Sequence, residues 1–385
     1  MKLTKKEASV LNSITRYCRS KPILINALYR QENGGTISAT NLETLVEVHN
    51  VGNGIKEDSL LIPMKLIGNV EYEGNRNQVI AGSSKFTTFD DLKEYPEVEQ
   101  LDMEHVSMGC YDLEDFRSNI EYAFRAVATE PTRYAINSVK MECGGAFYRF
   151  IATDGKRLHI SGDTSKSKER FEVMINHDMV DKFLKLTTNK TTGYVKVAKS
   201  KNIVEFIMDT KTGKHERDYR IIGLIVEGHY PEWRDVLPTQ GDSFEFRPDK
   251  EFITLLKDSW KMVRDSDLSK ATIFTCDTDT IMQVHTECRE TKQEMNGAVL
   301  IHGKVWTGKR AFQSCFFAEA LVVDEPCILY QKKEVEPENV PTVDDETLEE
   351  TLARIKVEDV KDCPITIKQK EGPPRLAIIM PISLG

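Results

Sequence analysis

The sequence predicts an α+β protein built from three similar modules, each with helices gathered on one face of antiparallel sheets. The first observation is length, because 385 residues exceed one ordinary core and favour about two to four domains. The second is a layout of helices, strands and turns that recurs three times. The third is an abundance of short apolar or alternating runs rich in β-branched and aromatic residues, which is typical of strands.

The recurring layout sets the expected domain boundaries. In each module a helix precedes a strand that ends in a polar turn, and a later segment closes the module. The strand-and-turn segments lie at 36–43, 152–155 and 274–279, and the closing segments lie at 93–98, 229–233 and 380–381. Runs such as 194–198, 203–208 and 298–302 are expected to be strands. We therefore expect domains at 1–108, 109–240 and 241–385.

The helices of the three modules are expected to carry a buried apolar face and a basic solvent face. In the third module apolar residues follow helical spacing from Phe252 to Val263, whereas Lys257 and Lys261 recur on the opposite side. A row of Lys and Arg is usually only a solvated face, but its recurrence in three modules strengthens a functional interpretation. The basic residues in question are Arg16, Arg19, Lys21, Arg117, Arg125, Lys182, Lys185, Lys250, Lys257, Lys261 and Arg264.

Composition limits the classes of function. Charged residues make up 29% of the chain and hydrophobic residues 40%, which is typical of soluble globular proteins. There is no apolar run of about 18 residues and no signal-peptide pattern, so we expect a cytoplasmic protein. The eight cysteines show no C-x-x-C pair and no zinc spacing with histidine, which predicts reduced thiols and no metal. The net charge of -9 argues against a chain coated in nucleic-acid-binding surface, although it is compatible with a basic stripe.

Three separated segments carry the most specific signal. They are 150–158, which contains the Thr153-Asp154-Gly155 turn, then 228–238, and the terminal run 378–384. Any one of them alone is weak, because a strand that ends in an Asp-Gly turn is common. Together, in this order and at these separations, they resemble the signature segments of the bacterial-type DNA polymerase sliding clamp family, the β subunit of the replicative polymerase.

The resemblance covers essentially the whole chain and implies a DNA-clamp fold, with three repeated domains, antiparallel sheets outside and helices lining a central hole. It implies a homodimeric ring that encircles double-stranded DNA independently of sequence and tethers the replicative polymerase as a processivity factor. The implied partners are DNA, a second copy of the chain, the polymerase, the clamp loader and other proteins with a clamp-binding motif, but no membrane. No cofactor is implied, and the chain would be an accessory subunit without a catalytic site.

The resemblance also implies a hydrophobic pocket between domains 2 and 3 that accepts a short peptide from these partners. Methionine and aliphatic side chains suit such a pocket because they repack easily around different peptides. Ordinary core packing is the alternative, and for Leu158 or Ile378 alone the two interpretations weigh equally. The matching positions are Thr153, Gly155, Lys156, Arg157, Leu158, Pro238, Ile378, Met380, Pro381 and Ile382.

The chain departs from the family's pattern in four places. Lys156 stands where His is common, Ser383 replaces a basic residue, and Gly385 extends past the usual terminal Leu. An acidic, proline-containing insertion is expected at 332–346 in the third domain. These departures leave the peptide preference open and suggest a divergent member, of phage or other mobile-element origin.

Three other interpretations compete with this one. Residues 303–310 nearly match a phosphate-binding G-x-x-x-x-G-K-[ST] loop, but Arg310 stands where the Mg²⁺-binding hydroxyl is required. Asp154 has no sequence neighbour that would make it a general acid or base. The serious alternative is a clamp-fold decoy or scaffold that binds clamp-interacting peptides without encircling DNA.

Overall fold

A computed structural model describes residues 2–15, 22–52, 58–63, 72–75, 78–81, 84–86, 92, 95–96, 107–130, 135–164, 169–212, 215–237, 243–265, 270–276, 280–301, 308–323, 325–331, 364–370 and 374–381. The chain divides into two units. The first unit contains Met1–Ser118, Ser138–Ala146 and Ser165–Gly228. The second contains Asn119–Asn137, Phe147–Thr164 and His229–Gly385.

The first unit is built on an eight-stranded antiparallel sheet. Its strand order is β4 (Ser59–Pro63), β1 (Asn26–Arg30), β2 (Thr36–Thr40), β3 (Thr44–Val48), β15 (His215–Leu224), β14 (Ile203–Thr212), β13 (Thr192–Lys199) and β8 (Ser107–Asp112). The unit also holds the pair β9 (Ser138–Gly144) and β12 (Arg170–Asn176), and the small sheet β5 (Tyr72–Asn75), β6 (Gln78–Ala81) and β7 (Ser84–Phe86). Helices α1 (Lys5–Thr15) and α3 (His177–Leu186) pack on each other and on the large sheet.

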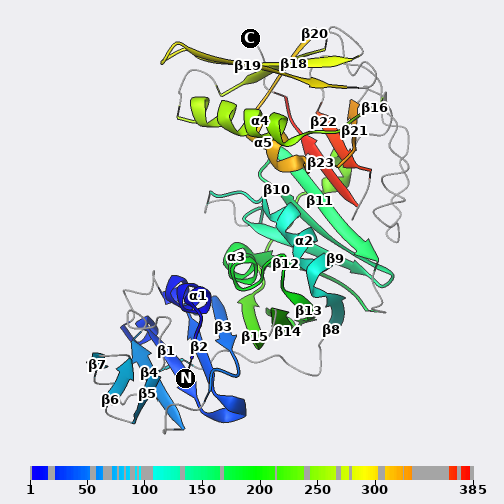
Figure 1. Cartoon of the computed structure of the whole chain (residues 1–385). Helices are drawn as coiled ribbons and strands as arrows, with labels where there is room; N and C mark the ends of the chain where they lie inside the picture. Colours follow the sequence, from blue (N-terminus) through cyan, green and yellow to red (C-terminus); the bar gives the residue numbers. More distant parts are fainter. Residues whose placement is uncertain are drawn as a thin grey trace. The chain divides into compact units, whose positions relative to one another are not determined.

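The second unit contains six antiparallel strands and a separate four-stranded sheet. The six lie in the order β10 (Phe147–Thr153), β11 (Arg157–Thr164), β23 (Arg375–Ile379), β22 (Ile365–Gln369), β21 (Cys327–Gln331) and β16 (Ser243–Phe246). The four-stranded sheet has the order β19 (Gln293–Leu300), β18 (Ile281–Cys288), β17 (Thr272–Cys276) and β20 (Gly308–Phe312). Helices α4 (Lys250–Val263) and α5 (Ser314–Ala320) pack together beside it (Figure 1), and α2 (Leu113–Phe124) contributes residues to both units.

Side-chain caps fix where the helices begin. Thr4 and Glu7 form a capping box at α1, in which each backbone amide donates to the other residue's side chain, at 2.7 Å and 3.2 Å. The Asn176 carboxamide accepts the Met179 amide at 2.7 Å at the start of α3. Asp249 caps α4 in the same way, because its carboxylate accepts the Phe252 amide at 2.7 Å. The helix positions are therefore encoded locally.

Aromatic side chains fill the core of each unit. Phe116, Phe183 and Phe206 meet edge to face in the first unit, with ring centroids 5.4 to 5.6 Å apart. In the second unit Phe274 and Phe317 stack at 4.6 Å inside a larger cluster of buried apolar residues. These contacts join strands to helices that are distant in sequence, so they hold the layers together.

The strand pairing repeats three times along the chain. In the first repeat β1 pairs with β4 and β2 with β3, in the second β9 pairs with β12 and β10 with β11, and in the third β17 pairs with β20 and β18 with β19. In the first two repeats the third strand also pairs with a strand from further along the chain. Strand β3 pairs with β15, and β11 pairs with β23. Their counterpart β19 ends its sheet among the strands that are described. The predicted α+β repeat is thus confirmed, while the exact domain boundaries stay predictions.

The turns after β2 and β10 repeat each other at the level of single hydrogen bonds. The Thr40 hydroxyl donates to the Thr44 carbonyl at 3.0 Å, and the Thr153 hydroxyl donates to the Arg157 carbonyl at 2.6 Å. Each of these hydroxyls also accepts the backbone amide two residues further on, at 3.0 Å and 3.1 Å. The two turns are therefore equivalent positions in two repeats.

The middle of each turn completes the match. The Asn41 and Asp154 side chains each accept two backbone amides, from the residues two and three positions later. The next residue has a left-handed backbone in both turns, with φ 81 at Leu42 and φ 85 at Gly155. Glycine adopts this conformation without the steric cost that a leucine incurs. The Asp-Gly sequence at 154–155 is therefore the better fit to the turn.

Most expected elements are found, and one was missed. The apolar faces predicted for α1, α2 and α4 are buried at Leu11, Phe116 and Leu256. Helix α5 was not predicted, because its seven residues are buried on nearly every side and show no amphipathic period. The expected insertion at 332–346 lies outside the described residues.

Candidate partner-binding site and basic helix faces

The candidate partner site forms where β11 pairs with β23 in the second unit. Leu158 lies opposite Ile378, and Ile160 lies opposite Leu376. Because residues two apart in a strand point to the same face, these four side chains form one apolar strip. The cluster around the strip also contains Ile151, Trp233 and Leu237, with Tyr230 packed against it. The segment that closes the middle module thus packs against the strip predicted to bind peptides.

The end of β23 forms an exposed rim beside this strip. The Met380 amide donates to the Lys156 carbonyl at 2.9 Å, which fixes the chain next to the Thr153–Arg157 turn. Met380 is 44% exposed, whereas Leu158 and Ile378 are 4% and 2% exposed. A flexible thioether therefore stands at the surface over a buried aliphatic floor.

Most of the predicted pocket residues lie together at this rim. The structure brings Thr153, Gly155, Lys156, Arg157, Leu158, Ile378, Met380 and Pro381 into one neighbourhood of the second unit. Pro238 and Ile382 lie outside the described residues. What this group binds remains a prediction.

Arg157 ties the turn to α5. Its Nε donates to the Asp154 carboxylate at 3.1 Å, and its Nη1 forms an ion pair with Glu319. The guanidinium carbon also lies 4.3 Å from the centroid of the Phe316 ring. Burial, with the nearby Glu319 carboxylate, raises the pKa of the Cys315 thiol to about 12. This thiol therefore stays protonated at neutral pH. The contacts of Arg157 serve to hold the turn against α5.

Two buried cations near the strip were not predicted from the sequence. Arg149 is 2% exposed, and its guanidinium carbon lies 4.6 Å from the Phe147 ring centroid and 5.2 Å from that of Trp233. Arg375 lies over the ring of Tyr122 at 5.2 Å. A charged residue in a strand normally marks the solvent face, so sequence patterns alone conceal these cation–π contacts.

The basic face predicted for α4 is solvent-exposed. Lys250, Lys257, Lys261 and Arg264 are all exposed, opposite the buried Leu256. Lys261 donates to Asp258 at 2.7 Å on the surface. An exposed pair of this kind costs little to break, so the ammonium remains available to another anion.

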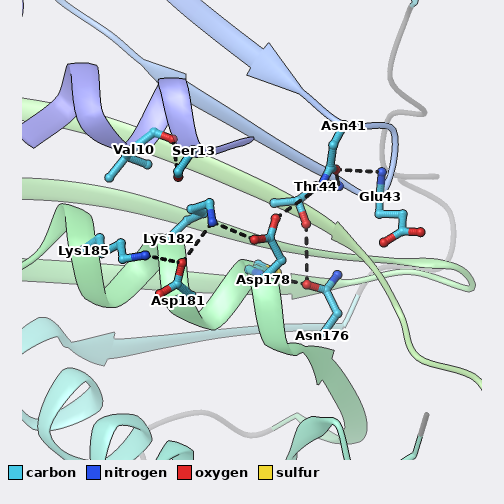
Figure 2. A network of polar contacts seen from close by, with 11 residues as sticks. Val10, Ser13, Asn41, Glu43, Thr44, Asn176, Asp178, Asp181, Lys182 and Lys185 are labelled. Atoms are coloured by element: carbon cyan, nitrogen blue, oxygen red, sulfur yellow. Dashed lines mark hydrogen bonds and ion pairs between the residues drawn. The ribbon is translucent and has the colours of Figure 1, made fainter. Parts of the chain in front are cut away.

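Two of the predicted surface cations are buried, which corrects the expectation of a solvated basic face at these positions. Lys182 is 4% exposed, and its ammonium lies between Asp178 at 2.6 Å and Asp181 at 2.9 Å (Figure 2). Arg117 is 9% exposed and donates to the Asn189 side chain. Both sit near the edge of an apolar helix face, where a long side chain folds back over the core instead of extending into water.

The remaining predicted cations divide between exposed and undescribed positions. Lys185 is exposed but donates to Asp181 at 2.7 Å, and Arg125 is exposed and donates to the Glu319 carbonyl at 2.8 Å. Arg16, Arg19 and Lys21 lie outside the described residues. The strongest row of exposed positive charge in the described part of the chain is therefore on α4.

Other chemistry finds little support. A phosphate-binding loop must lead into a helix, whereas residues 308–312 after the Gly-Lys motif form strand β20. Within the described ranges no group of three or more His, Cys, Asp or Glu side chains could hold a metal ion. Among the helices that the structure describes, none is long and apolar enough to cross a membrane.

Comparison with known proteins bears on the family. No family model matches the chain. It is 25% identical to the Beta sliding clamp of Vibrio cholerae over 237 residues, which are 57% of this chain and 61% of that protein. It is 24% identical to the Beta sliding clamp of Pseudomonas aeruginosa over 245 residues, 57% and 62% of the two chains. In sequence the chain therefore spans less than two thirds of the length of these relatives.

The fold comparison extends over nearly the whole chain. The DNA polymerase III β subunit of Thermotoga maritima matches with a TM-score of 0.73 at 18% identity, over 99% of this chain and 97% of that one. The DNA polymerase sliding clamp of Bacillus subtilis matches with a TM-score of 0.74 at 13% identity, over 99% and 97%. The chain thus has the fold of the bacterial DNA polymerase III β subunit, and its sequence similarity to Beta sliding clamps confirms the resemblance drawn from the three segments.

Proposed function

We propose that the chain is a DNA sliding clamp, a homodimeric ring that encircles duplex DNA and tethers the replicative polymerase as a processivity factor. The observation that carries the proposal is the position of β19, which ends its sheet among the described strands. Its counterparts β3 and β11 each pair with the last strand of the next expected domain, which is β15 within 109–240 and β23 within 241–385. The last described strand that lies wholly within the first expected domain, 1–108, is β7, so pairing of β19 with β7 of a second copy closes a head-to-tail ring.

The expected dimensions of such a ring suit a duplex. Six domains with two helices each place twelve helices around the hole. At a spacing of about 9 Å their axes form a circle about 35 Å across, and helix radii of about 5 Å leave an opening of about 25 Å. DNA passes through such an opening with room for water.

The exposed cations of α4 support a sliding contact with DNA. A tether that moves along DNA must hold phosphates weakly, because each fixed contact adds to a salt-dependent affinity. Flexible Lys and Arg tips make exchangeable contacts to the backbone and read no base edges. Retention then comes from enclosure, and the net charge of -9 keeps DNA away from the rest of the surface.

The apolar strip of β11 and β23 supports the binding of partner peptides from the polymerase, the clamp loader and other clamp-binding proteins. Its buried aliphatic floor and exposed Met380 provide a place for apolar side chains of a peptide. In this role the chain is a cytoplasmic accessory subunit, and the catalysis belongs to the polymerase.

The ring predicts a defined mass and a topological bond to DNA. In solution the chain of 43.9 kDa is expected to form a dimer of twice that mass, measured by light scattering at micromolar concentration. Loaded on circular DNA by a clamp loader, it is expected to stay bound until the DNA is cut and then to slide off. A strictly monomeric chain that still binds partner peptides would instead favour the decoy or scaffold.

A variant with Leu158→Ala and Met380→Ala is expected to lose partner-peptide affinity by about thirty-fold or more, because both apolar anchors are truncated. Fluorescence anisotropy with a labelled polymerase-derived peptide measures the loss, and a thermal melt checks folding. The matched control is Leu45→Ala with Leu224→Ala, which truncates the equivalent positions where β3 pairs with β15. Unchanged affinity in the first variant would remove the site assignment.

Charge reversal at Lys257 and Lys261 is expected to shorten the residence of the loaded protein on DNA and to flatten its salt dependence, because two phosphate contacts are lost. Both residues are exposed, so thermal stability should change little. The control reverses Lys196 and Lys211, two exposed residues of β13 and β14, with the same change in net charge. Equal effects of the two variants would show that α4 does not face the DNA.

A further inference from the structure

The junction of β3 and β15 in the first unit is a second copy of the junction that holds the candidate partner site. The pairing of Leu45 with Ile222 corresponds to that of Leu158 with Ile378. The Leu224 amide donates to the Glu43 carbonyl at 2.9 Å, as the Met380 amide does to the Lys156 carbonyl. Even the exposed rim residue is matched, since Leu224 is 41% exposed and Met380 is 44% exposed.

The two junctions share this aliphatic pair, rim hydrogen bond and exposed rim residue, but they differ in the side chains next to them. Where the second junction pairs Ile160 with Leu376, the first pairs Glu47 with Arg220. The neighbouring strands differ in the same way. Glu205 of β14 lies opposite Ile222 of β15, whereas Thr366 of β22 lies opposite Ile378 of β23. The first junction therefore carries charges at three positions where the second carries two aliphatic residues and a threonine.

These three charges form one ion-paired cluster. The Arg220 Nε pairs with the Glu205 carboxylate, and its Nη1 donates to Glu47 at 3.3 Å. The side chains of Glu205 and Glu47 are 2% and 8% exposed, and that of Arg220 is 25% exposed. The two carboxylates hold the pKa of Arg220 above its usual value against the opposing effect of burial. The single guanidinium is thus shared by two carboxylates, and the cluster keeps one net negative charge.

The turn of the first junction is also anchored differently. Asn41 donates to Asp178 of α3 at 3.3 Å, and the Thr44 hydroxyl donates to the Asn176 side chain at 3.5 Å (Figure 2). Glu43 and Leu42 occupy the places of Lys156 and Gly155 in the second junction. The rim of the first junction is therefore acidic where the other is basic.

We propose that Glu47, Glu205 and Arg220 close the first junction to partner peptides, so that each chain accepts a single peptide although it contains the frame of two sites. This inference rests on the proposed function of the second junction. A peptide leucine or phenylalanine set against the cluster would remove the remaining water from Arg220 and offer its charge no new partner. Specificity between two similar surfaces thus comes from a feature that repels the ligand at one of them.

The test transfers the second junction's residues onto the first, as Glu47→Ile, Glu205→Thr and Arg220→Leu. A short fluorescein-labelled peptide from a replicative polymerase is titrated at fixed protein concentration to give the number bound per chain. The wild-type chain is expected to bind one and the variant two. Adding Leu158→Ala and Met380→Ala to the variant should leave only the new site, one peptide per chain.

A matched control changes another ion-paired triad by the same types of substitution. Lys140 contacts Glu142 and Glu172, each at 2.9 Å, on β9 and β12. The control variant Lys140→Leu, Glu142→Ile and Glu172→Thr is expected to bind one peptide, as the wild type does. A milder variant, Glu47→Gln, Glu205→Gln and Arg220→Met, keeps the test decisive if the first does not fold.

Three results would overturn the inference. A folded junction variant that still binds one peptide would show that the cluster does not close the site. A wild-type chain that binds two peptides would show that the first junction is open. A wild-type chain that binds none would refute the partner site itself, and this outcome is distinct from the other two.

Discussion

Replacement of Arg220 by leucine is expected to lower the free energy of unfolding by about 3 to 5 kcal/mol, the usual effect of removing one partner from a buried ion pair. The guanidinium contacts Glu47 and Glu205, whose side chains are 8% and 2% exposed. Without it, two carboxylates remain together in a site with little water, and each raises the free energy of the other. Urea denaturation at neutral pH measures the loss.

The same experiment separates the charge effect from the loss of side-chain volume. In the background of Glu47→Ile and Glu205→Thr, no buried carboxylate is left without a partner, so Arg220→Leu should restore much of the stability. Arg217→Leu is an unsuitable control because Arg217 pairs with the buried Glu7. Arg234→Leu is better, since Arg234 pairs with an exposed Glu232. Equal losses at Arg220 and Arg234 would contradict the role assigned to burial.

Acidification is expected to destabilise the protein through His159. This side chain is fully buried, stacked on Tyr122 at 4.8 Å, and its Nδ1 lies 3.0 Å from the Tyr122 carbonyl. Burial, with the nearby positive charge of Arg157 and Arg125, lowers the pKa of His159 to about 3. The Nδ1–H then donates to the carbonyl, and the ring is neutral in the folded state.

The sign of the pH effect follows from the unfolded state. The unfolded chain takes up a proton near pH 6.5 and the folded chain does not, so stability is full above that pH and falls below it. Between pH 7.5 and 5 the loss from this one group is about 2 kcal/mol. Urea denaturation across this range, on the wild type and on His159→Asn, isolates it.

Comparing the wild type with His159→Asn cancels the contribution of other titrating groups to the pH dependence of stability. Burial also lowers the pKa of His177, which adds to the same trend in both proteins. Asp181 contributes only at lower pH, because its lowered pKa makes its stabilisation disappear below its usual value of 3.8. Identical pH dependence in the wild type and His159→Asn would show that the histidine is not held neutral.

The fold was predictable from the sequence to the extent that it is encoded locally. The turn at Thr153–Arg157 was recognisable because its side chains bond to their own backbone. Helix α4 was recognisable because its apolar period lies within one short stretch. Helix α5 was not, because a short helix buried on nearly every side has no polar face to give it a period.

The candidate site was predicted less completely. Leu158 and Ile378 were identified through a resemblance, and the structure adds that they lie opposite each other on neighbouring strands. The roles of Glu319 and Arg220 depend on which strands and helices become neighbours, and no sequence interval encodes this. Lys182 was expected in solvent because a helical wheel records angle but not the length and path of the side chain.

The contrast between the two junctions also bears on how the chain avoids assembling incorrectly. Similar repeats invite a strand to pair with the wrong neighbour during folding. If β3 met β23 in place of β15, Glu47 would lie against Leu376, and Ile160 of β11 would be left to face Arg220 on β15. Each incorrect pairing would place a carboxylate or a guanidinium among aliphatic side chains. The ionic and aliphatic pairs therefore favour the correct strand pairing at each sheet edge.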